Sequence, residues 1–297
     1  MASITLTVTQ ATLEKMYLHY QNNITKVPAH TMFQAKTANC TITAYLSKKI
    51  AFQGQHPELE AKKWGTVEIA KSSIVTPGLH LKTAVGADEV GTGDYLGPIV
   101  VCCAYVREDQ VQTLLDMGIR DSKQLTDDII GVMAAKIKQI IPYHCIILPN
   151  DKYNLMTDKG MNANSIKAFL HNKALLSLQE KIGQMPEIVI LDEFVNQRKY
   201  YEYLSELPSK PAVFSNLTFI QKAEGVHVSV AAASIIARAS FVDYMAAVES
   251  QVGMRLPKGA GSGVDSAARA IYRQKGADTL KRISKWHFSN TKRVTSR

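Results

Sequence analysis

Two different spacings of apolar side chains occur in the first part of the chain. Between residues 10 and 24 they recur at helical intervals and form one stripe: Leu13, Met16, Tyr17, Tyr20 and Ile24. In "NCTITAYL" (39–46) apolar and polar residues alternate instead, which predicts a half-buried strand, and "SKK" joins this strand to "IAFQGQ" as a hairpin. Pro57 favours a short helix over 57–64. Residues 1–70 are therefore predicted to form a small α+β domain with a partly exposed antiparallel face.

The pattern changes beyond residues 71–82, which we interpret as a linker. Short apolar, β-rich runs follow, separated by stretches with helical spacing. The runs that predict strands are 82–88, 97–106, 143–149, 187–192 and 216–222, and those that predict helices are 126–140, 165–182 and 228–251. The last helix is rich in small residues, which suits close packing on a sheet. Strands that alternate with helices predict an α/β domain with a partly parallel sheet over residues 83–297.

The charge balance points to a polyanionic partner. The 297 residues include 35 basic and 26 acidic side chains, a formal net charge of +9, which favours nucleic acid over an anionic membrane. No apolar run approaches the roughly 18 residues of a membrane span. The start "MASITLTVTQ" lacks the features of a secretory signal, so we expect a cytoplasmic protein without membrane contact. The cysteines lack metal-ligand spacing and are expected to be reduced and structural: Cys40, Cys102, Cys103 and Cys145.

Four acidic residues lie beside predicted strand ends or turns. Asp88 and Glu89 follow an apolar run, Asp192 ends "EIVIL", and Glu224 lies in "QKAEGVH" before the alanine-rich helix. Ligand sites of open α/β sheets lie at the carboxyl ends of the strands. Any one of these acids could simply be solvated or cap a helix. Neighbours on a strand point to opposite faces, so Asp88 and Glu89 can share a site only where the strand ends or bends.

Carboxylates that do meet at such an edge need a counter-ion. Two of them about 4 Å apart repel each other by roughly 4 kcal/mol at an effective dielectric constant near 20. All-oxygen ligands suit Mg²⁺ or Mn²⁺. Two such ions can hold a phosphodiester, activate water and stabilise the leaving oxygen, which is nuclease chemistry.

"GTG" (91–93) after the paired acids allows two interpretations. Gly91 and Gly93 are either plain turn residues, or they let main-chain amides approach a ribose and its phosphates closely. The second interpretation, with Thr92 between them, would provide contact with a 2′-hydroxyl group, which a nuclease specific for RNA/DNA hybrids needs.

Four stretches together resemble the type 2 ribonuclease H family, and within it the ribonuclease HIII branch rather than ribonuclease HII. They are "GADEVGTGDYLGPIVVCCAYV" (86–106), "IRDSKQLTD" (119–127), "VILDEF" (189–194) and "HVSVAAASIIARASF" (227–241), in the order that the family has them. Glu224, where the HII branch has aspartate, and "GTG", where HII typically has "GRG", favour the HIII branch. The stretch 44–65 looks like the N-terminal extension of that branch, which is similar to half of a TATA-binding protein.

The resemblance implies an RNase H-like mixed sheet flanked by helices and cleavage of the RNA strand of RNA/DNA hybrids by two divalent metal ions, Mg²⁺ or Mn²⁺. The products would carry 5′-phosphate and 3′-hydroxyl ends. It assigns catalysis and metal binding to Asp88, Glu89, Asp192 and Glu224. The missing arginine in "GTG" makes incision at a single ribonucleotide doubtful, so we expect a preference for stretches of several ribonucleotides.

Further substrate contacts are expected in the loop "DSK" and in the N-terminal unit. Lys123 is expected to reach a phosphate and Ser122 to position the loop; alternatively, Asp121 and Ser122 cap the next helix. The N-terminal candidates for hybrid contact are Lys48, Lys49, Phe52 and Gln53. For His227 we favour a packed or solvated histidine over a role in proton transfer. Ser234 is at least as well explained by helix packing as by substrate contact.

Two other classes of function remain open. "GADEVGTGD" is also similar to the first phosphate loop of the actin-like and sugar-kinase phosphotransferases, although the second phosphate loop of that group is not found. The alternative to both enzymes is a non-catalytic nucleic-acid-binding protein with structural acids. We expect a monomer in each case.

Overall fold

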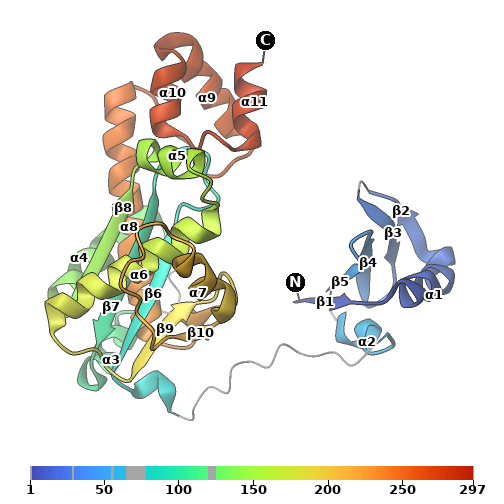
Figure 1. Ribbon diagram of the computed structural model, residues 1–297, viewed down its shortest axis with the longest axis horizontal. Helices are drawn as coiled ribbons and strands as arrows, with labels where there is room; N and C mark the ends of the chain where they lie inside the picture. Colours follow the sequence, from blue (N-terminus) through green and yellow to red (C-terminus); the bar gives the residue numbers. More distant parts are fainter. Residues whose placement is uncertain (1, 29, 55–56, 65–77, 120–124, 297) are drawn as a thin grey trace. The chain divides into compact units, whose positions relative to one another are not determined.

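The computed structural model describes residues 2–28, 30–54, 57–64, 78–119 and 125–296. It divides into two compact units, Met1–Ile74 and Val75–Arg297 (Figure 1). Each unit has its own sheet and its own core.

The first unit is an antiparallel sheet of order β1-β5-β4-β3-β2, with helix α1 packed on one face. Its elements are β1 (Ala2–Thr7), α1 (Gln10–Tyr20), β2 (Ile24–Lys26), β3 (Thr31–Lys36), β4 (Cys40–Tyr45), β5 (Lys49–Gly54) and α2 (Pro57–Ala61), with the 3-10 turn η1 (Gln21–Asn23). The Thr9 side chain caps α1 by accepting from the Thr12 amide. The helix predicted within residues 10–24 is confirmed as α1, and the predicted hairpin is confirmed as the pair β4 and β5. Leu13, Met16 and Tyr20 of α1 are buried against the sheet.

The second unit is built on a mixed sheet of order β10-β9-β6-β7-β8. Its strands are β6 (Ala84–Val90), β7 (Ile99–Val106), β8 (Tyr143–Leu148), β9 (Ile188–Asp192) and β10 (Thr218–Ile220). β6, β9 and β10 run parallel, whereas β7 is antiparallel to both β6 and β8. The partly parallel sheet predicted from the alternation of strands and helices is confirmed.

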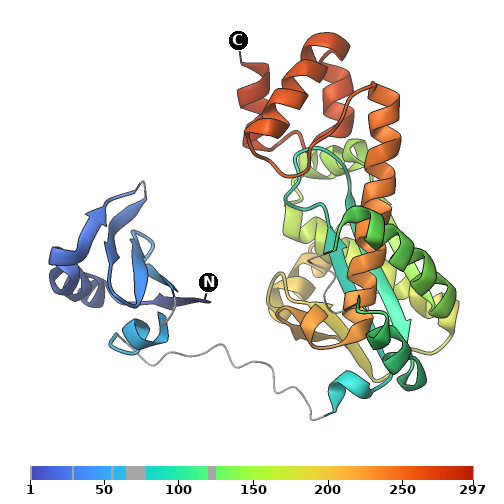
Figure 2. The same ribbon diagram turned by 180° about the vertical axis from the view of Figure 1, so that it is seen from behind.

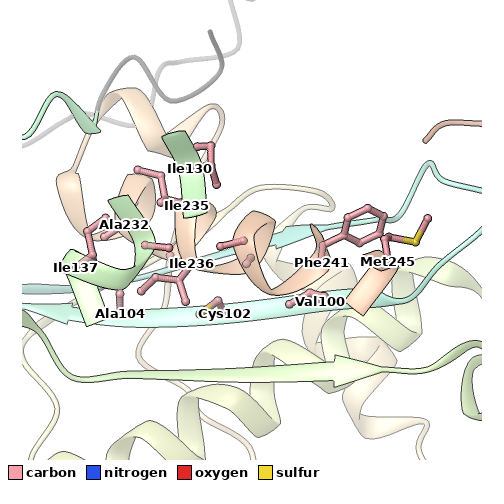
Figure 3. Packing of buried hydrophobic residues seen from close by; sticks show 14 of the residues in the cluster. Val100, Cys102, Ala104, Ile130, Ile137, Ala232, Ile235, Ile236, Phe241 and Met245 are labelled. Carbon is pink, nitrogen blue, oxygen red and sulfur yellow. The ribbon is translucent and has the colours of Figure 1, made fainter. Parts of the chain in front are cut away.

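Helices cover both faces of this sheet (Figures 1 and 2). One face carries α3 (Glu108–Asp116), α4 (Asp127–Ile140) and α8 (Val228–Val252), and the other carries α6 (Ala163–Ile182) and α7 (Gln197–Ser205). Figure 3 shows the first layer, in which Ile236 of α8 lies over β7 near Cys102 and Ile235 lies beside Ile130 of α4. The remaining elements are α5 (Asn150–Asp158), α9 (Ser262–Lys275), α10 (Ala277–Ile283), α11 (Ser289–Thr295), η2 (Leu79–Leu81) and η4 (Ala223–Gly225).

α8 is the central core helix of the second unit. It is long and apolar enough, by length and composition alone, to cross a membrane, contrary to the expectation that no such run exists. However, 56% of its most apolar window is buried inside the unit, where it packs on β6, β7 and α4. Small residues such as Ala232 and Ala233 allow this close approach, so its low polarity is explained by burial on the sheet.

The cysteines differ from the expectation of four reduced thiols. Cys102 on β7 and Cys145 on β8 lie directly opposite each other in the antiparallel ladder, with their Cα atoms 4.2 Å apart, and are joined by a disulfide. The prediction is therefore wrong for this pair, because the register that aligns them is not visible in the sequence. Cys40 and Cys103 are free and buried, as expected.

Candidate active site

Three parallel strands bring acidic residues to one edge of the second sheet. β6 pairs with β9 so that Ala87 lies opposite Leu191, which places Asp88 and Asp192 one residue further along neighbouring strands. β10 pairs with β9 on its other side, and η4, which carries Glu224, follows it. The Ala223 amide donates to Asp192 Oδ1 at 2.8 Å and so fixes this turn against β9. Asp88, Asp192 and Glu224 therefore share the edge where ligand sites of such sheets lie.

The electrostatics of Asp88 show how close these acids are. Burial is the largest cause that raises its pKa, to about 7, and the negative charges of Glu89 and Asp192 raise it further. Hydrogen bonds from the Ser234 hydroxyl and the Glu89 amide act in the opposite direction. Besides these two hydrogen bonds, nearby positive charge would stabilise the anionic form of this aspartate. The oxygen ligands of Asp88 and Asp192 are those that Mg²⁺ and Mn²⁺ prefer.

Glu89 points to the opposite face of the sheet from Asp88. β6 continues through Val90, so the side chains of the two acids still alternate, but both acids lie in the last three residues of the strand. The face of Gly86 and Asp88 lies against α8: a Cβ atom on Gly86 would lie 2.2 Å from the Val230 nitrogen. Ala87 and Glu89 face α6 instead, where Ala87 joins the core under that helix.

On the α6 side, Glu89 is enclosed by two basic side chains. Lys167 Nζ donates to Glu89 Oε1 at 2.9 Å, and His171 Nε2 contacts Oε2 at 2.8 Å. Burial acts to raise the pKa of Glu89, but His171 and then Lys167 outweigh it and lower the pKa to about 2. Among the residues that the structure describes, no three histidine, cysteine or acidic side chains are grouped as metal ligands. The arrangement is a pair of carboxylates on the α8 side and a neutralised glutamate on the α6 side.

Lys167 and His171 were missed by the sequence analysis. They stand four residues apart on α6 and therefore lie on the same side of the helix. Both are buried, His171 completely, in a helix whose other buried positions are mostly apolar. The sequence does contain a sign of their role: a lysine and a histidine lie four residues apart in a helical stretch whose other residues mostly suit a buried core.

The turn after the paired acids depends on glycine at one position. Gly91 has φ +95°, and a Cβ atom there would lie 2.2 Å from the Pro98 carbonyl oxygen. Gly93 is exposed with open space around it, whereas Thr92 Oγ1 is buried and has no hydrogen-bond partner among the described residues. Gly91 is thus a structural turn residue, while Gly93 leaves room for close approach of a ligand.

The C-terminal helices hold this turn in place. Lys285 is fully buried, and its ammonium group donates to the carbonyl oxygens of Asp94 and Gly97, both at 2.7 Å. The Tyr95 amide donates to Gly259 O at 2.8 Å, and the Lys285 amide donates to Tyr95 O at 2.8 Å. The segment that contains Lys285 is therefore docked on the rest of the unit.

Two further candidates have clear structural surroundings. The His227 ring is completely buried; its Nδ1 accepts from the Ser229 amide at 3.0 Å and its Nε2 lies 2.9 Å from the Lys82 carbonyl oxygen. It caps α8 and anchors the chain before β6, so the favoured interpretation as a packed histidine is confirmed. Ser234 contacts Asp88 rather than being a packing residue alone. Ser122 and Lys123 lie outside the described residues.

In the N-terminal unit the four substrate candidates divide by strand face. Lys48, Lys49 and Gln53 are exposed. Phe52 is completely buried in the core beneath α1, so its prediction as a substrate contact is wrong. The alternation of β5 explains this result, because Ile50 and Phe52 point into the core while Lys49 and Gln53 point away from it.

Comparisons with known proteins agree over the full length. The family model "Ribonuclease HII" matches residues 85–291, and a domain of unknown function (DUF3378) matches residues 3–76. Ribonuclease HIII of Listeria monocytogenes serotype 4b (strain CLIP80459) is 41% identical over 306 residues, covering 99% of this chain and 98% of the relative. Ribonuclease HIII of Bacillus subtilis (strain 168) is 39% identical over 307 residues, covering 99% and 97%.

Solved structures give the same result. Bst-RNase HIII, crystallised in complex with Mn²⁺, matches with a TM-score of 0.72 and 39% identity over 99% of this chain and 98% of that chain. Aquifex aeolicus RNase H3 shares the fold with a TM-score of 0.58, 22% identity and coverage of 96% and 100%. The expected RNase H-like fold with an additional N-terminal domain is confirmed. By sequence and by structure, the chain belongs to the ribonuclease HIII group of the ribonuclease HII family.

Proposed function

We propose that this chain is an endonuclease that hydrolyses the RNA strand of RNA/DNA hybrids with divalent metal ions, leaving 5′-phosphate and 3′-hydroxyl ends. The main support for this proposal is that Asp88 and Asp192 lie next to each other at the ends of the neighbouring strands β6 and β9. These two carboxylates, with Glu224 on the neighbouring turn and Glu89 on β6, would hold Mg²⁺ or Mn²⁺. A bound ion of this kind supplies Lewis-acid stabilisation of the phosphate and a more acidic water molecule.

The side chains of this unit have separate parts in the reaction. Asp88 and Asp192 provide the negative charge that gathers cations at the sheet edge, and Ser234 holds Asp88 by a hydrogen bond. The Gly91 turn, fixed by Lys285, places the exposed Gly93 next to the paired acids, where a ribose can approach without a side chain in the way. Because "GTG" replaces the arginine-containing turn, we propose that stretches of several ribonucleotides are preferred over a single one.

The first unit is proposed to bind the hybrid through the open face of its sheet. Strand alternation turns Lys49 and Gln53 away from the core, and Lys48 lies in the turn before them. Lysines on such a face contact phosphates without reading sequence, and polar side chains among them can reach a sugar hydroxyl. We further propose that the enzyme acts as a monomer in the cytoplasm, where hybrids arise during replication and transcription.

Cleavage by Asp88→Asn tests the catalytic proposal. Labelled RNA/DNA hybrid, duplex RNA and duplex DNA are incubated with the full chain, with and without Mg²⁺ or Mn²⁺. We expect metal-dependent cleavage of the hybrid alone, and a loss in Asp88→Asn beyond the roughly 100-fold that outer partners of a metal site cause. Asp158→Asn, at an exposed acid on α5, is the matched control. Normal cleavage by Asp88→Asn would refute the role of Asp88 in catalysis. Hybrid binding without cleavage by the unaltered chain would support a binding protein with structural acids, and nucleotide hydrolysis without hybrid would support a phosphotransferase.

Salt-dependent binding tests the role of the first unit. Lys48→Ala combined with Lys49→Ala should weaken hybrid binding and reduce its dependence on salt concentration, because two phosphate contacts are lost. Lys15→Ala, at an exposed position on α1, is the control on the covered side of the sheet. Unchanged affinity of the double variant would refute the assignment.

A further inference from the structure

Lys167, His171 and Phe194 form a closed group around Glu89. The side-chain exposures of Lys167 and His171 are 7% and 0%, and that of Glu89 is 13%. Each oxygen of the carboxylate is matched with a different nitrogen, at 2.9 Å for Lys167 and 2.8 Å for His171. Because an ionised carboxylate only accepts hydrogen bonds, the His171 ring must donate from Nε2. The group thus fixes the rotation of the carboxylate as well as its charge.

Phe194 connects this group to the other half of the site. Its ring stacks on the His171 ring, with centroids 5.4 Å apart and planes at 21°, and the Lys167 ammonium lies 4.0 Å from the ring centroid. A cation over an aromatic face is held by the ring quadrupole. Phe194 follows Asp192 by two residues, so Asp192 and the Glu89 partners are attached to the same short segment after β9.

The charges of this group affect how strongly a divalent ion binds at this edge of the sheet. A carboxylate that already accepts from two basic groups has less negative charge available, and a buried ammonium repels an approaching cation. The same contacts keep the carboxylate from turning, which a reaction that depends on ligand placement requires. The contacts that fix the orientation of the Glu89 carboxylate therefore also lower the affinity of the site for the ion.

We propose that Lys167 and His171 are positioning residues that hold Glu89 in one orientation and weaken ion binding in doing so. The inference rests on the proposed function, in which Glu89 serves the metal site. Replacing Lys167 by an uncharged side chain of equal length should strengthen ion binding but slow cleavage, because the carboxylate gains charge and loses its fixed orientation. A purely structural lysine would show no such opposition, since its loss would weaken binding and cleavage together.

The test measures Mn²⁺ binding to the full chain by electron paramagnetic resonance without nucleic acid, and then hybrid cleavage. Lys167→Met should bind Mn²⁺ roughly three- to thirty-fold more tightly, the scale of one unit charge acting on a divalent ion several ångströms away in a partly solvated site. Its kcat should fall roughly 10- to 100-fold, as for other outer partners of metal sites. Lys173→Met, which removes an exposed lysine from the same helix, should change neither quantity.

Two conservative variants keep the test decisive if Lys167→Met folds poorly. Lys167→Arg retains the charge and should keep Mn²⁺ affinity within about two-fold, and His171→Gln retains an N–H donor near Nε2 and should keep most of the cleavage rate. Weaker or unchanged Mn²⁺ binding in folded Lys167→Met, or tighter binding in Lys167→Arg, would overturn the proposal. Failure of the proposed function is seen separately, as absence of hybrid cleavage by the unaltered chain, because the Mn²⁺ measurement needs no hybrid.

Discussion

Asp88 is predicted to destabilise the second unit when no metal is bound. Asp88→Asn keeps the shape of the side chain and can still accept a hydrogen bond from Ser234, but it removes a charge that burial, Glu89 and Asp192 all disfavour. We therefore expect the variant to lose cleavage and to gain free energy of unfolding in the presence of a chelator. Loss of activity combined with gain of stability is the expected signature of a functional charge.

The magnitude follows from the pKa. A rise from the ordinary 3.8 to about 7 in the folded state corresponds to roughly 4 kcal/mol, at about 1.36 kcal/mol per pKa unit. Asp88 is only half-buried by its accessible surface, and solvent screening brings the expected gain to about 2 kcal/mol. The folded-state pKa is raised, so the cost is absent below about pH 4, grows as the pH increases to about 7, and is constant above that.

The assay is urea unfolding of the full chain at pH 4.5 and pH 8 with a chelator present. The transition of the second unit is followed by the fluorescence of Trp286, in a Trp64→Phe background that removes the other tryptophan. At pH 8 the Asp88→Asn transition should lie at higher urea concentration by about 2 kcal/mol. At pH 4.5, about 0.7 pH unit above the ordinary pKa of an aspartate, the difference should fall to about 1 kcal/mol.

Added Mg²⁺ should reverse the order at pH 8. An ion that binds the folded unaltered chain stabilises it by mass action, whereas the variant lacks one ligand and gains less. If Asp88→Asn proves less stable than the unaltered protein at pH 8 with chelator, the carboxylate is held by favourable contacts and the reasoning about its charge is wrong.

Three further substitutions test packing, each by urea unfolding of the unit concerned. Gly86→Ala should destabilise the second unit by about 3 kcal/mol or more, because its Cβ would lie 2.2 Å from the Val230 nitrogen; an unchanged midpoint would show that α8 can move away from β6. Trp64→Phe removes the indole donor to the Tyr20 hydroxyl at 2.7 Å and should cost the first unit about 1 kcal/mol; no loss would mean that water replaces the bond. Phe241→Ala empties a buried site on α8 and should cost about 3–5 kcal/mol; a cost below 1 kcal/mol would indicate collapse of the cavity.

Much of the fold was predictable because it depends on local patterns. The spacing of apolar residues gave α4, α6 and α8 to within about two residues, and the strand runs gave the positions of β7 to β9. The sequence also indicated which strand ends would carry acids. α3, α5, α7 and α9 were not predicted, although α9 carries apolar residues at helical spacing, Val264, Ala268 and Ile271.

The site was less predictable because it depends on register and on distant partners. That Asp88 and Glu89 are adjacent is visible in the sequence, but that β6 runs on past them and turns Glu89 toward α6 is not. The partner of each acid lies far along the chain, with 78 positions separating Glu89 from Lys167. Cys102 and Cys145 were misjudged for the same reason, since only the pairing of β7 with β8 places them opposite each other.

The buried ammonium of Lys285 has a consequence for the order in which the enzyme matures during synthesis. The turn beside the paired acids takes its support from a side chain 191 positions further along the chain. During synthesis on the ribosome, the nascent chain therefore contains its acidic residues long before Lys285 is available to hold the turn beside them. We expect ribosome-bound chains that end before Gly259 not to cleave hybrid, and longer ribosome-bound chains to cleave it once Lys285 has emerged from the ribosome. Full cleavage by a chain stalled at that point would show that the turn orders itself without its C-terminal support.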